Sequence, residues 1–292
     1  MMKQEDCYVI LVNYCNPQIT IECIESLKRA RCNPKKIVVV DNNSPDDSRK
    51  VLRRIQDIVL IESEENGGFA AANNIGIKYA LSHKGKSVLL LNNDTIVSEN
   101  FFEKLFYNAD CKTVYVPKIY YYSKPNMLWY AGGKINYKKG LQRHFGDMKF
   151  DCDKFSYEKD VDYATGCCML ISKEIIEKIG LLAEEYFMYW EDMDYSLKLK
   201  KNAIQIRYLP EVKMWHKIGL SGGKSSKMAI YYCNRNRFLV LKKYHFGLCA
   251  WSYTIITRAL KYGFSFVDKS NNRMILKAWL DFRKGSLGKV DL

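Results

Sequence analysis

The first hundred residues alternate short apolar runs with longer segments in which apolar residues recur every three or four positions. Uninterrupted short apolar runs are typical of strands that are buried on both faces, and the longer period is typical of helices. The predicted strands cover residues 8–12, 37–40, 59–62 and 88–91, and the predicted helices cover residues 20–31, 48–55 and 70–81. This alternation predicts an α/β fold in which helices flank a mostly parallel sheet with right-handed crossovers.

The pattern continues less regularly through the second half of the chain. Gly166 falls in the middle of one predicted strand, and glycine in a strand often marks the close approach of a ligand or another backbone. Pro210 is expected to end another strand, and residues 120–159, rich in Tyr, Lys and Gly, are interpreted as an irregular, hairpin-bearing loop region that is suited to cover a substrate. The expected helices cover residues 101–108, 173–179 and 195–202, and the expected strands cover residues 114–119, 161–172, 205–209 and 212–216.

Polar residues follow three of the predicted strands at the points where the strands end. These clusters are Asn13-Tyr14, Asp41-Asn42-Asn43 and Asn92-Asn93-Asp94. Because the carboxyl ends of parallel strands share one edge of a sheet, we expect the three clusters to converge there. The turn Asn66-Gly67-Gly68 precedes the third helix, and its glycines let backbone amides approach a phosphate. Together these features predict a nucleotide site.

Two of these clusters have an alternative interpretation. Asp41 suits a carboxylate that accepts hydrogen bonds from a base or a ribose, and the alternative is that it caps the following helix. Asn92 and Asp94 offer oxygen ligands for a divalent metal, and the alternative is a polar turn after a core strand. The chain contains neither a P-loop lysine motif nor G-x-G-x-x-G. We therefore expect a metal to hold the phosphates.

The second half of the chain offers one acidic cluster and one histidine. Glu191 and Asp192 directly follow an aromatic run, where desolvation would raise the pKa of a carboxyl group toward that of a general base. The alternative is that they begin a helix and interact favourably with its dipole. His216 follows a strand and is the best histidine candidate for a metal or phosphate contact, the alternative being a structural histidine.

The composition of the 292-residue chain is ordinary for a globular protein, with 48% hydrophobic and 27% charged residues. Its ten cysteines include no C-x-x-C pair, which favours reduced thiols in a cytosolic protein over disulfides or a zinc site. The amino-terminal segment lacks a basic region before its short apolar run, so no signal peptide is predicted. No uncharged apolar run approaches about 18 residues, so no transmembrane helix is predicted.

Positive charge is concentrated at the carboxyl end. The net charge is +14, and residues 217–292 hold 15 Lys and Arg against three Asp, which is a net charge of +12. Basic amphipathic helices with aromatic residues are predicted over 227–244 and 273–283, and such helices are typical of elements that lie on an anionic membrane. The alternatives are nucleic-acid binding, for which no motif is present, and an ordinary solvated basic domain.

The ordered series VILVNYCN, VVVDNNSPDDS, ENGGFAAANNIGI, LLLNNDT, TGCCMLI and FMYWEDMDYSLKLKKN, followed by a proline and a histidine, resembles family 2 glycosyltransferases of the GT-A fold. Within that family the chain is most similar to the rhamnosyltransferase-like enzymes of bacterial surface-polysaccharide synthesis. The resemblance covers residues 7 to 245. It implies a catalytic domain over 1–225, with a nucleotide-sugar half (1–110) and an acceptor half (111–225), and leaves 226–292 as a basic helical tail that associates with the membrane.

The resemblance implies an inverting transfer of a sugar from a nucleotide-diphosphate sugar, such as a dTDP- or UDP-sugar, to a glycan or lipid-linked acceptor at the cytoplasmic face of the membrane. Asp192, with Glu191 beside it, matches the catalytic base, and Asp94, Asn92 and His216 match the ligands of Mg²⁺ or Mn²⁺. The residues implied for the donor are Asn13, Tyr14, Asp41, Asn43, Asn66, Gly67, Gly68, Asn73, Asn92 and Asn93, and those for the acceptor are Gly166, Cys167 and Trp190.

The sequence departs from the family pattern at one position. Asn92 stands where the metal motif of the family has Asp, and an amide oxygen can coordinate a metal but brings one negative charge less. Two other classes of function are weighed against the glycosyltransferase. A nucleotidyltransferase would release pyrophosphate, and a non-catalytic scaffold would bind no nucleotide diphosphate.

Overall fold

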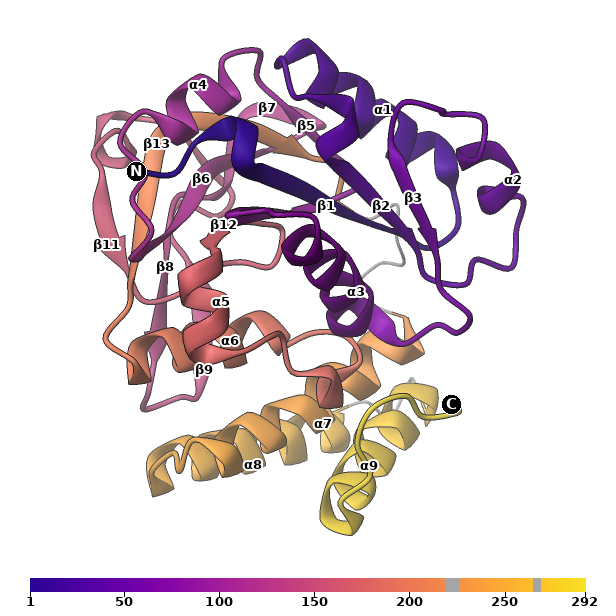
Figure 1. Cartoon of the computed structure of the whole chain (residues 1–292). Helices are drawn as coiled ribbons and strands as arrows, with labels where there is room; N and C mark the ends of the chain where they lie inside the picture. Colours follow the sequence, from indigo (N-terminus) through magenta and orange to yellow (C-terminus); the bar gives the residue numbers. More distant parts are fainter. Residues whose placement is uncertain (219–225, 265–268) are drawn as a thin grey trace.

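A computed structural model describes residues 1–218, 226–264 and 269–292 and shows a central sheet covered by helices on both faces (Figure 1). Four parallel strands form the amino-terminal half, as the sequence predicts, and their order in the structure is β3-β2-β1-β4. β1, β2 and β4 are almost entirely buried, because helices cover both faces of this part of the sheet. The four strands are β1 (Cys7–Asn13), β2 (Ile37–Asp41), β3 (Val59–Glu62) and β4 (Ser87–Asn92).

The helices connect these strands and form the two outer layers. α1 and α4 lie on one side of the sheet and α3 and α5 lie on the other (Figure 1). α1 is amphipathic and packs residues such as Ile24 and Leu27 into the core, which explains its apolar spacing. The helices of this part of the chain are α1 (Pro17–Arg29), α2 (Ser48–Leu52), α3 (Gly68–Ser82), α4 (Phe101–Phe106), α5 (Lys173–Ile179) and α6 (Glu191–Lys201).

The second half extends the same sheet with strands of both directions. β12 (Cys168–Ser172) pairs antiparallel with β4 and joins the parallel part to β6 (Thr113–Tyr121). The sheet continues through β7 (Lys124–Tyr130) and β10 (Lys149–Phe150), while β13 (Gln205–His216) pairs with β6, β5 (Thr95–Val97) and β11 (Lys159–Val161). A separate hairpin consists of β8 (Gly133–Asn136) and β9 (Leu141–His144). The hairpins expected within 120–159 are therefore present, and they fill most of that segment.

Two strand predictions are wrong. Gly166 does not lie inside a strand, because the predicted strand over 161–172 is divided into β11 and β12 and residues 162–167 form the turn between them. Pro210 does not end a strand, because β13 runs through it. The register of β13 against β6 shifts between Leu209 and Lys213, and a proline, which has no N–H to donate, is tolerated at such an irregularity.

The carboxyl-terminal tail forms a further helical layer below α6 and α3 in Figure 1. It consists of α7 (Lys227–Lys243), α8 (Leu248–Phe264) and α9 (Lys269–Lys284). α7 packs against α9 and also buries Arg235, Asn236 and Arg237 against the rest of the molecule. The expected domain boundary after residue 225 falls at the end of a segment, 219–225, that lies outside the described residues.

Two further sequence predictions concern the whole chain. Within the described residues, no helix combines the length and the apolar character needed to cross a membrane. All ten cysteines are free thiols, and burial raises the pKa of several of them, including Cys7, Cys23 and Cys32, each to about 12. The cysteines therefore form no disulfide frame.

Candidate functional site

A chain of hydrogen bonds joins three polar strand ends at the carboxyl edge of the sheet. Asn13 lies beside Asp41 in the register of β1 and β2, and its Nδ2 donates to Asp41 Oδ2 over 2.9 Å. Thr20 at the start of α1 donates to Asn13 Oδ1 and accepts from Asn93 Nδ2, each over 2.7 Å. The clusters that the sequence places at separate strand ends therefore converge, as expected.

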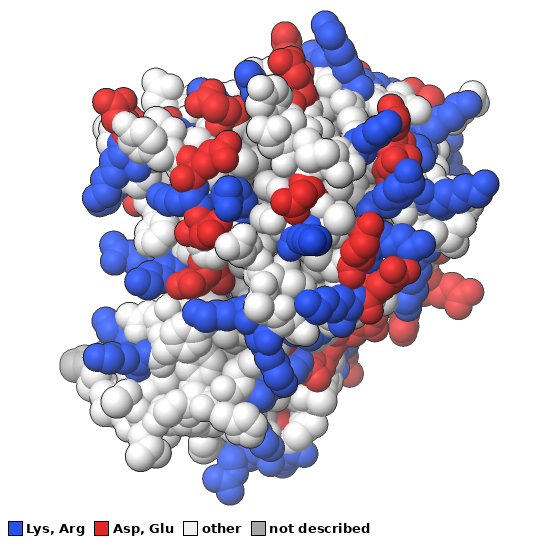
Figure 2. All heavy atoms as spheres, turned by 60° about the vertical axis from the view of Figure 1, so that its left-hand side comes forward, with Lys and Arg blue, Asp and Glu red and all other residues white. Residues whose placement is uncertain are grey.

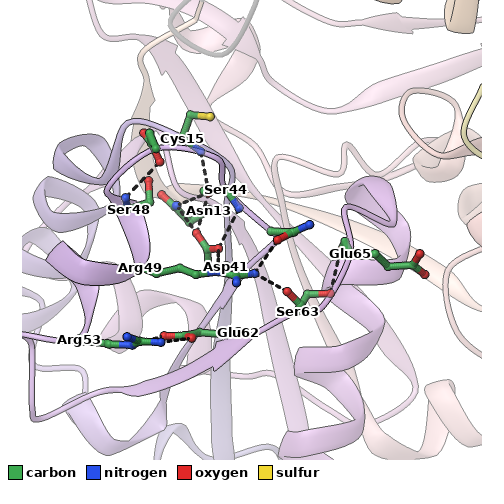
Figure 3. Close-up of polar contacts among 12 residues, drawn as sticks. Asn13, Cys15, Asp41, Ser44, Ser48, Arg49, Arg53, Glu62, Ser63 and Glu65 are labelled. Atoms are coloured by element: carbon green, nitrogen blue, oxygen red, sulfur yellow. Dashed lines mark hydrogen bonds and ion pairs between the residues drawn. The ribbon is translucent and has the colours of Figure 1, made fainter. Parts of the chain in front are cut away.

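Asp41 is completely buried, and its carboxylate accepts four hydrogen bonds (Figure 3). The donors are Asn13 Nδ2, the Ser44 amide, the Ser44 hydroxyl and Arg49 Nε, at 2.6 to 3.0 Å. Burial opposes ionisation, but these hydrogen bonds outweigh it and hold the pKa of Asp41 below its ordinary value. Asp41 is not the cap of the next helix, because α2 begins at Ser48 with Asp47 at its cap position.

Arg49 connects Asp41 to the residues around it. Its Nη2 donates to Asn43 Oδ1 over 2.9 Å and also to the carbonyl oxygen of Ser63, while its Nε holds Asp41 (Figure 3). Asn43 is exposed and adopts a left-handed backbone conformation with φ of 59°. Arg49 is not among the residues predicted from the sequence, although a basic residue on the next helix, eight positions after a strand-end aspartate, is a signal for such a contact.

The glycine turn before α3 is fixed by side chains and by a distant carbonyl group. The Gly67 amide donates to Asn42 Oδ1 over 3.2 Å and the Gly68 amide donates to Asn66 Oδ1 over 3.0 Å. Gly68 has φ of 86°, and a Cβ there would overlap the carbonyl oxygen of Phe187. The need for glycine at position 68 is therefore explained without an approaching phosphate. The segment before α6 occupies the space that a side chain would need.

Two of the expected donor residues have unremarkable surroundings. Asn73 is buried and its Nδ2 donates to the Phe69 carbonyl one turn earlier in α3, over 2.9 Å. Tyr14 is half-exposed at the end of β1. The neighbouring Asn74, which the sequence analysis did not select, bonds to the Leu182 backbone and to Glu184, and thereby fixes the segment that leads to α6.

Asp94 and His216 meet at the turn between β4 and β5, and Asn92 ends β4 just before that turn. His216 pairs with Thr95 across β13 and β5, and its Nε2 lies 3.0 Å from Asp94 Oδ1. Both side chains are buried. Among the described residues, neither the buried side-chain oxygen of Asn92 nor the Nδ1 atom of His216 has a hydrogen-bond partner. The turn thus gathers a carboxylate, an imidazole and an unsatisfied amide oxygen.

These three groups fit a metal that is only partly held by protein. No set of three or more His, Cys, Asp or Glu side chains within the described residues is arranged as a metal site. Mg²⁺ in nucleotide enzymes is commonly held by one or two carboxylates and completed by substrate phosphates and water. The buried amide oxygen of Asn92, which lacks any partner, is the observation that favours a ligand at this turn.

Asp192 lies in the first turn of α6 and contacts the turn before β12. Its Oδ2 accepts from the Gly166 amide over 3.1 Å and from the Tyr163 hydroxyl, and its Oδ1 accepts from the Met193 amide over 2.8 Å. A Cβ on Gly166 would lie 3.4 Å from both Asp192 Cβ and the Phe69 ring, so a side chain at position 166 would touch both residues. Tyr163 is a further residue that the sequence analysis missed, because it lies 29 positions earlier in the chain.

Glu191 has a different environment from its neighbour. Its side chain is buried and its Oε2 has no hydrogen-bond partner. Burial, followed by the charge of Asp192, raises the pKa of Glu191 well above its ordinary value. The raised pKa favours the neutral form of Glu191, whereas the neighbouring Asp192 carboxylate is half-buried and accepts hydrogen bonds from three donors. Both also begin α6, so the favourable position at the helix dipole holds as well.

Cys167 connects the two acidic parts of the site. Its carbonyl oxygen accepts from the Asn92 amide over 2.8 Å, while the preceding residue, Gly166, donates to Asp192. Burial raises the pKa of the Cys167 thiol, and the charges of Asp94 and Asp192 both add to this effect. The Asn92–Asp94 turn and the base candidate Asp192 are therefore bonded to two consecutive residues, Cys167 and Gly166. Trp190 is buried at the cap position of α6, with a positive φ of 78°.

The chain is similar in sequence to known glycosyltransferases. Residues 8–180 match the family model described as glycosyl transferase family 2. The chain is 30% identical over 241 residues to the low-salt glycan biosynthesis hexosyltransferase Agl10 of Haloferax volcanii, covering 80% of this chain and 75% of that protein. It is 28% identical over 251 residues to the dTDP-rhamnosyl transferase RfbF of Shigella flexneri, covering 82% and 81% respectively.

Solved structures show the same architecture. The structure of S. aureus TarS 1-349 superposes with a TM-score of 0.58 at 17% identity, covering 96% of this chain and 80% of that one. The mannosyltransferase PcManGT from Pyrobaculum calidifontis gives a TM-score of 0.56 at 14% identity, covering 96% and 83%. At these identities the likeness concerns the fold, which is GT-A. From its family model and its relatives, the chain is a glycosyltransferase that belongs to glycosyl transferase family 2.

Proposed function

We propose that this enzyme transfers a sugar from a dTDP- or UDP-sugar, with inversion, to a hydroxyl group of a glycan or lipid-linked glycan during polysaccharide synthesis. The observation that carries the proposal is the pair Gly166 and Cys167, which join Asp192 to the Asn92–Asp94 turn. A single displacement needs a base close to the groups that bind the diphosphate, and Asp192 and the Asn92–Asp94 turn are the candidates for these two roles. The name of the Shigella relative makes dTDP-rhamnose the first donor to test.

The chemistry assigned to the chain's own residues is a direct displacement at the anomeric carbon. Asp192 takes the proton from the acceptor hydroxyl while the oxygen of that hydroxyl attacks the anomeric carbon. The bond between the anomeric carbon and the diphosphate oxygen breaks on the opposite face. Tyr163 and the Gly166 amide orient the Asp192 carboxylate. Asn43 and the 66–68 turn are assigned to the nucleoside side of the donor, and the buried Asp41 is assigned to holding Asn43 there through Arg49.

Asp94 and His216, with the amide oxygen of Asn92, are the residues that would hold Mg²⁺ or Mn²⁺. When bound, such an ion supplies positive charge next to the departing nucleoside diphosphate. The solved structure of PcManGT is a complex with GDP-Man and Mn²⁺, which supports a divalent ion in this fold.

A thermal-shift panel tests the donor. We expect one class among the UDP-, dTDP- and GDP-sugars to raise the melting temperature, and Mn²⁺ or Mg²⁺ to increase that shift, because a ligand that binds only the folded state stabilises it. Turnover with an acceptor extract should release nucleoside diphosphate, and NMR of the product should show inverted anomeric configuration. Release of pyrophosphate would instead identify a nucleotidyltransferase, and the absence of both binding and donor hydrolysis would identify a non-catalytic scaffold.

We also propose that the tail binds the anionic surface of the membrane on its cytoplasmic side. Four apolar residues of α8 are 48% to 85% exposed, and their spacing places them on one side of the helix: Leu248, Ile255, Ile256 and Leu260. The tail lobe, at the bottom of Figure 2, shows basic side chains around a broad uncharged surface. Exposed apolar residues beside basic side chains suit anionic lipid headgroups.

Vesicle co-sedimentation tests this second proposal. The full chain should bind vesicles that contain phosphatidylglycerol, bind less as salt rises, and bind little to vesicles of phosphatidylcholine alone. Ile256→Glu should reduce binding, while Tyr107→Glu, at a more exposed aromatic position on the catalytic domain, should not. Equal binding to both kinds of vesicle, or no binding, would contradict the proposal.

A further inference from the structure

The segment just before α6 has an unusual backbone. Phe187, Tyr189 and Trp190 have φ values of 63°, 65° and 78°, in the left-handed region that residues with a Cβ seldom adopt. Such conformations persist only where the surrounding structure determines them. The segment ends at Glu191, so its course sets where α6 begins and where the Asp192 carboxylate lies.

Asn236 in α7 supplies part of what holds this segment. Its Nδ2 donates to the carbonyl oxygens of Tyr186, Met188 and Tyr189, over 2.9, 2.8 and 2.8 Å. The side chain is completely buried. One amide group with two N–H bonds therefore serves three carbonyl groups within four residues of irregular backbone, which only a fixed geometry permits.

Arg235 completes the attachment from the same helix. Its Nη2 donates to the carbonyl oxygens of Glu185 and Tyr186, over 3.2 and 3.1 Å, and its Nη1 donates to Gly288 over 2.7 Å. The guanidinium lies 4.8 Å from the centre of the Tyr232 ring and is completely buried. Carbonyl oxygens and a ring face thus replace the water that a buried guanidinium has lost.

The remaining carbonyl of the segment points to the donor side. Phe187 accepts from the Phe69 amide over 2.7 Å, directly beside Gly68. All five carbonyl groups from Glu185 to Tyr189 therefore accept a hydrogen bond, three of them from Asn236. The same segment touches the start of α3 at one side and begins α6 at the other, so its position affects both the donor turn and the base candidate.

α7 also holds α6 directly. Asp194, one turn into α6, is completely buried. It accepts from the Tyr244 hydroxyl over 3.0 Å and from Lys243 Nζ over 2.7 Å, in addition to the Tyr186 hydroxyl over 2.9 Å. α7 thus contacts both the 185–189 segment and α6. Both sets of contacts hold the loop and the first helical turn that carry Asp192.

We propose that Asn236 and Arg235 are positioning residues for catalysis, which act by holding the 185–190 segment in the conformation that places Asp192. The tail is then part of the catalytic architecture as well as a membrane-binding element. This inference rests on the proposed role of Asp192 as the base. It assigns to α7 a function that membrane binding alone would not require.

The test compares two asparagines of the same helix. Asn236→Ala should lower kcat by about 100-fold, the size of effect expected when a reacting group is displaced by about 1 Å, and should change the KM for the donor by less than about threefold. Asn234→Ala is the matched control, because Asn234 Nδ2 bonds only within α7, to the Ile230 carbonyl, and it should keep kcat within about twofold. Melting temperatures of both variants verify that they fold.

A double-mutant cycle separates positioning from general damage. In an Asp192→Asn background, Asn236→Ala should lower kcat by less than about threefold more, because residues that act as a unit are not additive. Full additivity, or a normal kcat in Asn236→Ala, would overturn the inference. If Asn236→Ala does not fold, Arg235→Lys carries the same test, since it keeps the charge but loses the two-pronged contact. Normal turnover in Asp192→Asn alone would instead overturn the proposed function.

Discussion

Asp41 and Asp192, the two carboxylates assigned to the donor and the acceptor side, are held by different parts of the chain. Two of the three residues that donate to Asp41 follow it within eight positions, namely Ser44 and Arg49. Asp192 accepts from Gly166 and Tyr163, which lie 26 and 29 positions away, and the segment before it is held by Asn236, about 50 positions later. The Asp41 cluster is therefore mostly a local construction, whereas the surroundings of Asp192 depend on contacts between distant parts of the chain.

The difference between the surroundings of Asp41 and Asp192 has a physical consequence. Contacts between near neighbours form at little cost in loop entropy, and the Asp41 cluster is rigid because every acceptor site on its carboxylate is used. The Asp192 region combines strained backbone with distant partners, so its geometry can be lost while the sheet stays folded. Substitutions on the acceptor side should mainly affect turnover, and those on the donor side should mainly affect stability.

The largest effect is expected for Asp192→Asn. Removal of the base should lower kcat by about 10³-fold and leave donor-induced thermal shifts in place, because the amide keeps the size of the side chain but cannot take a proton. Asp160→Asn is the control, since Asp160 is a half-exposed partner of Arg207 on the surface and should leave kcat within about twofold. Normal turnover in Asp192→Asn would contradict the expectation that substitutions on the acceptor side mainly affect turnover.

Gly68→Ala tests the contact between the two sides. The added Cβ would meet the Phe187 carbonyl at a position with φ of 86°, so we expect a loss of about 2–4 kcal/mol of unfolding free energy and a clear fall in kcat. Two controls divide the effect. Gly180→Ala has φ of 81° but open space and reports backbone strain alone, and Gly247→Ala has open space with no such φ and should be neutral. Equal losses in Gly68→Ala and Gly180→Ala would show that the contact with Phe187 is unimportant.

Asp41→Asn should reduce stability in a manner that depends on pH. The pKa of Asp41 is lowered on folding, so its contribution is present above the unfolded value of about 3.9 and is lost as pH falls through the folded value. Urea unfolding should show a deficit of about 2 kcal/mol at pH 7 that shrinks below about pH 4. A deficit of the same size at pH 3 would mean that the charge of Asp41 does not matter for the cluster.

Glu191→Gln should have the smallest effect and the opposite sign. The pKa of Glu191 is raised on folding, so the stabilisation is complete below the unfolded value of about 4.3 and is lost as pH rises toward the folded value. The Gln variant avoids this loss. We expect it to match the wild type near pH 4 and to exceed it by about 1 kcal/mol at pH 8, as measured by urea unfolding. A difference that does not change with pH would contradict the neutral state assigned to Glu191.

The four strands of the amino-terminal half, the helices between them and the convergence of the polar strand ends follow from the sequence alone. Their apolar runs, such as Val88 to Leu91, are short and continuous because a parallel strand is buried on both faces. The polar residues after them meet because parallel strands end at one edge. The same local order explains why Asp41 and its partner Ser44 are recognisable as one turn.

Tertiary structure alone decided how the second half of the site is assembled. Gly166 lies in a turn rather than a strand, Pro210 lies within one, and the partners of Asp192 are Tyr163, Gly166 and the segment held from α7. No periodicity connects residues 163, 192 and 236, because their contacts are set by packing over long sequence separations. The sequence identified Asp192 as an acidic residue at a helix start, and only the fold showed what holds it in place.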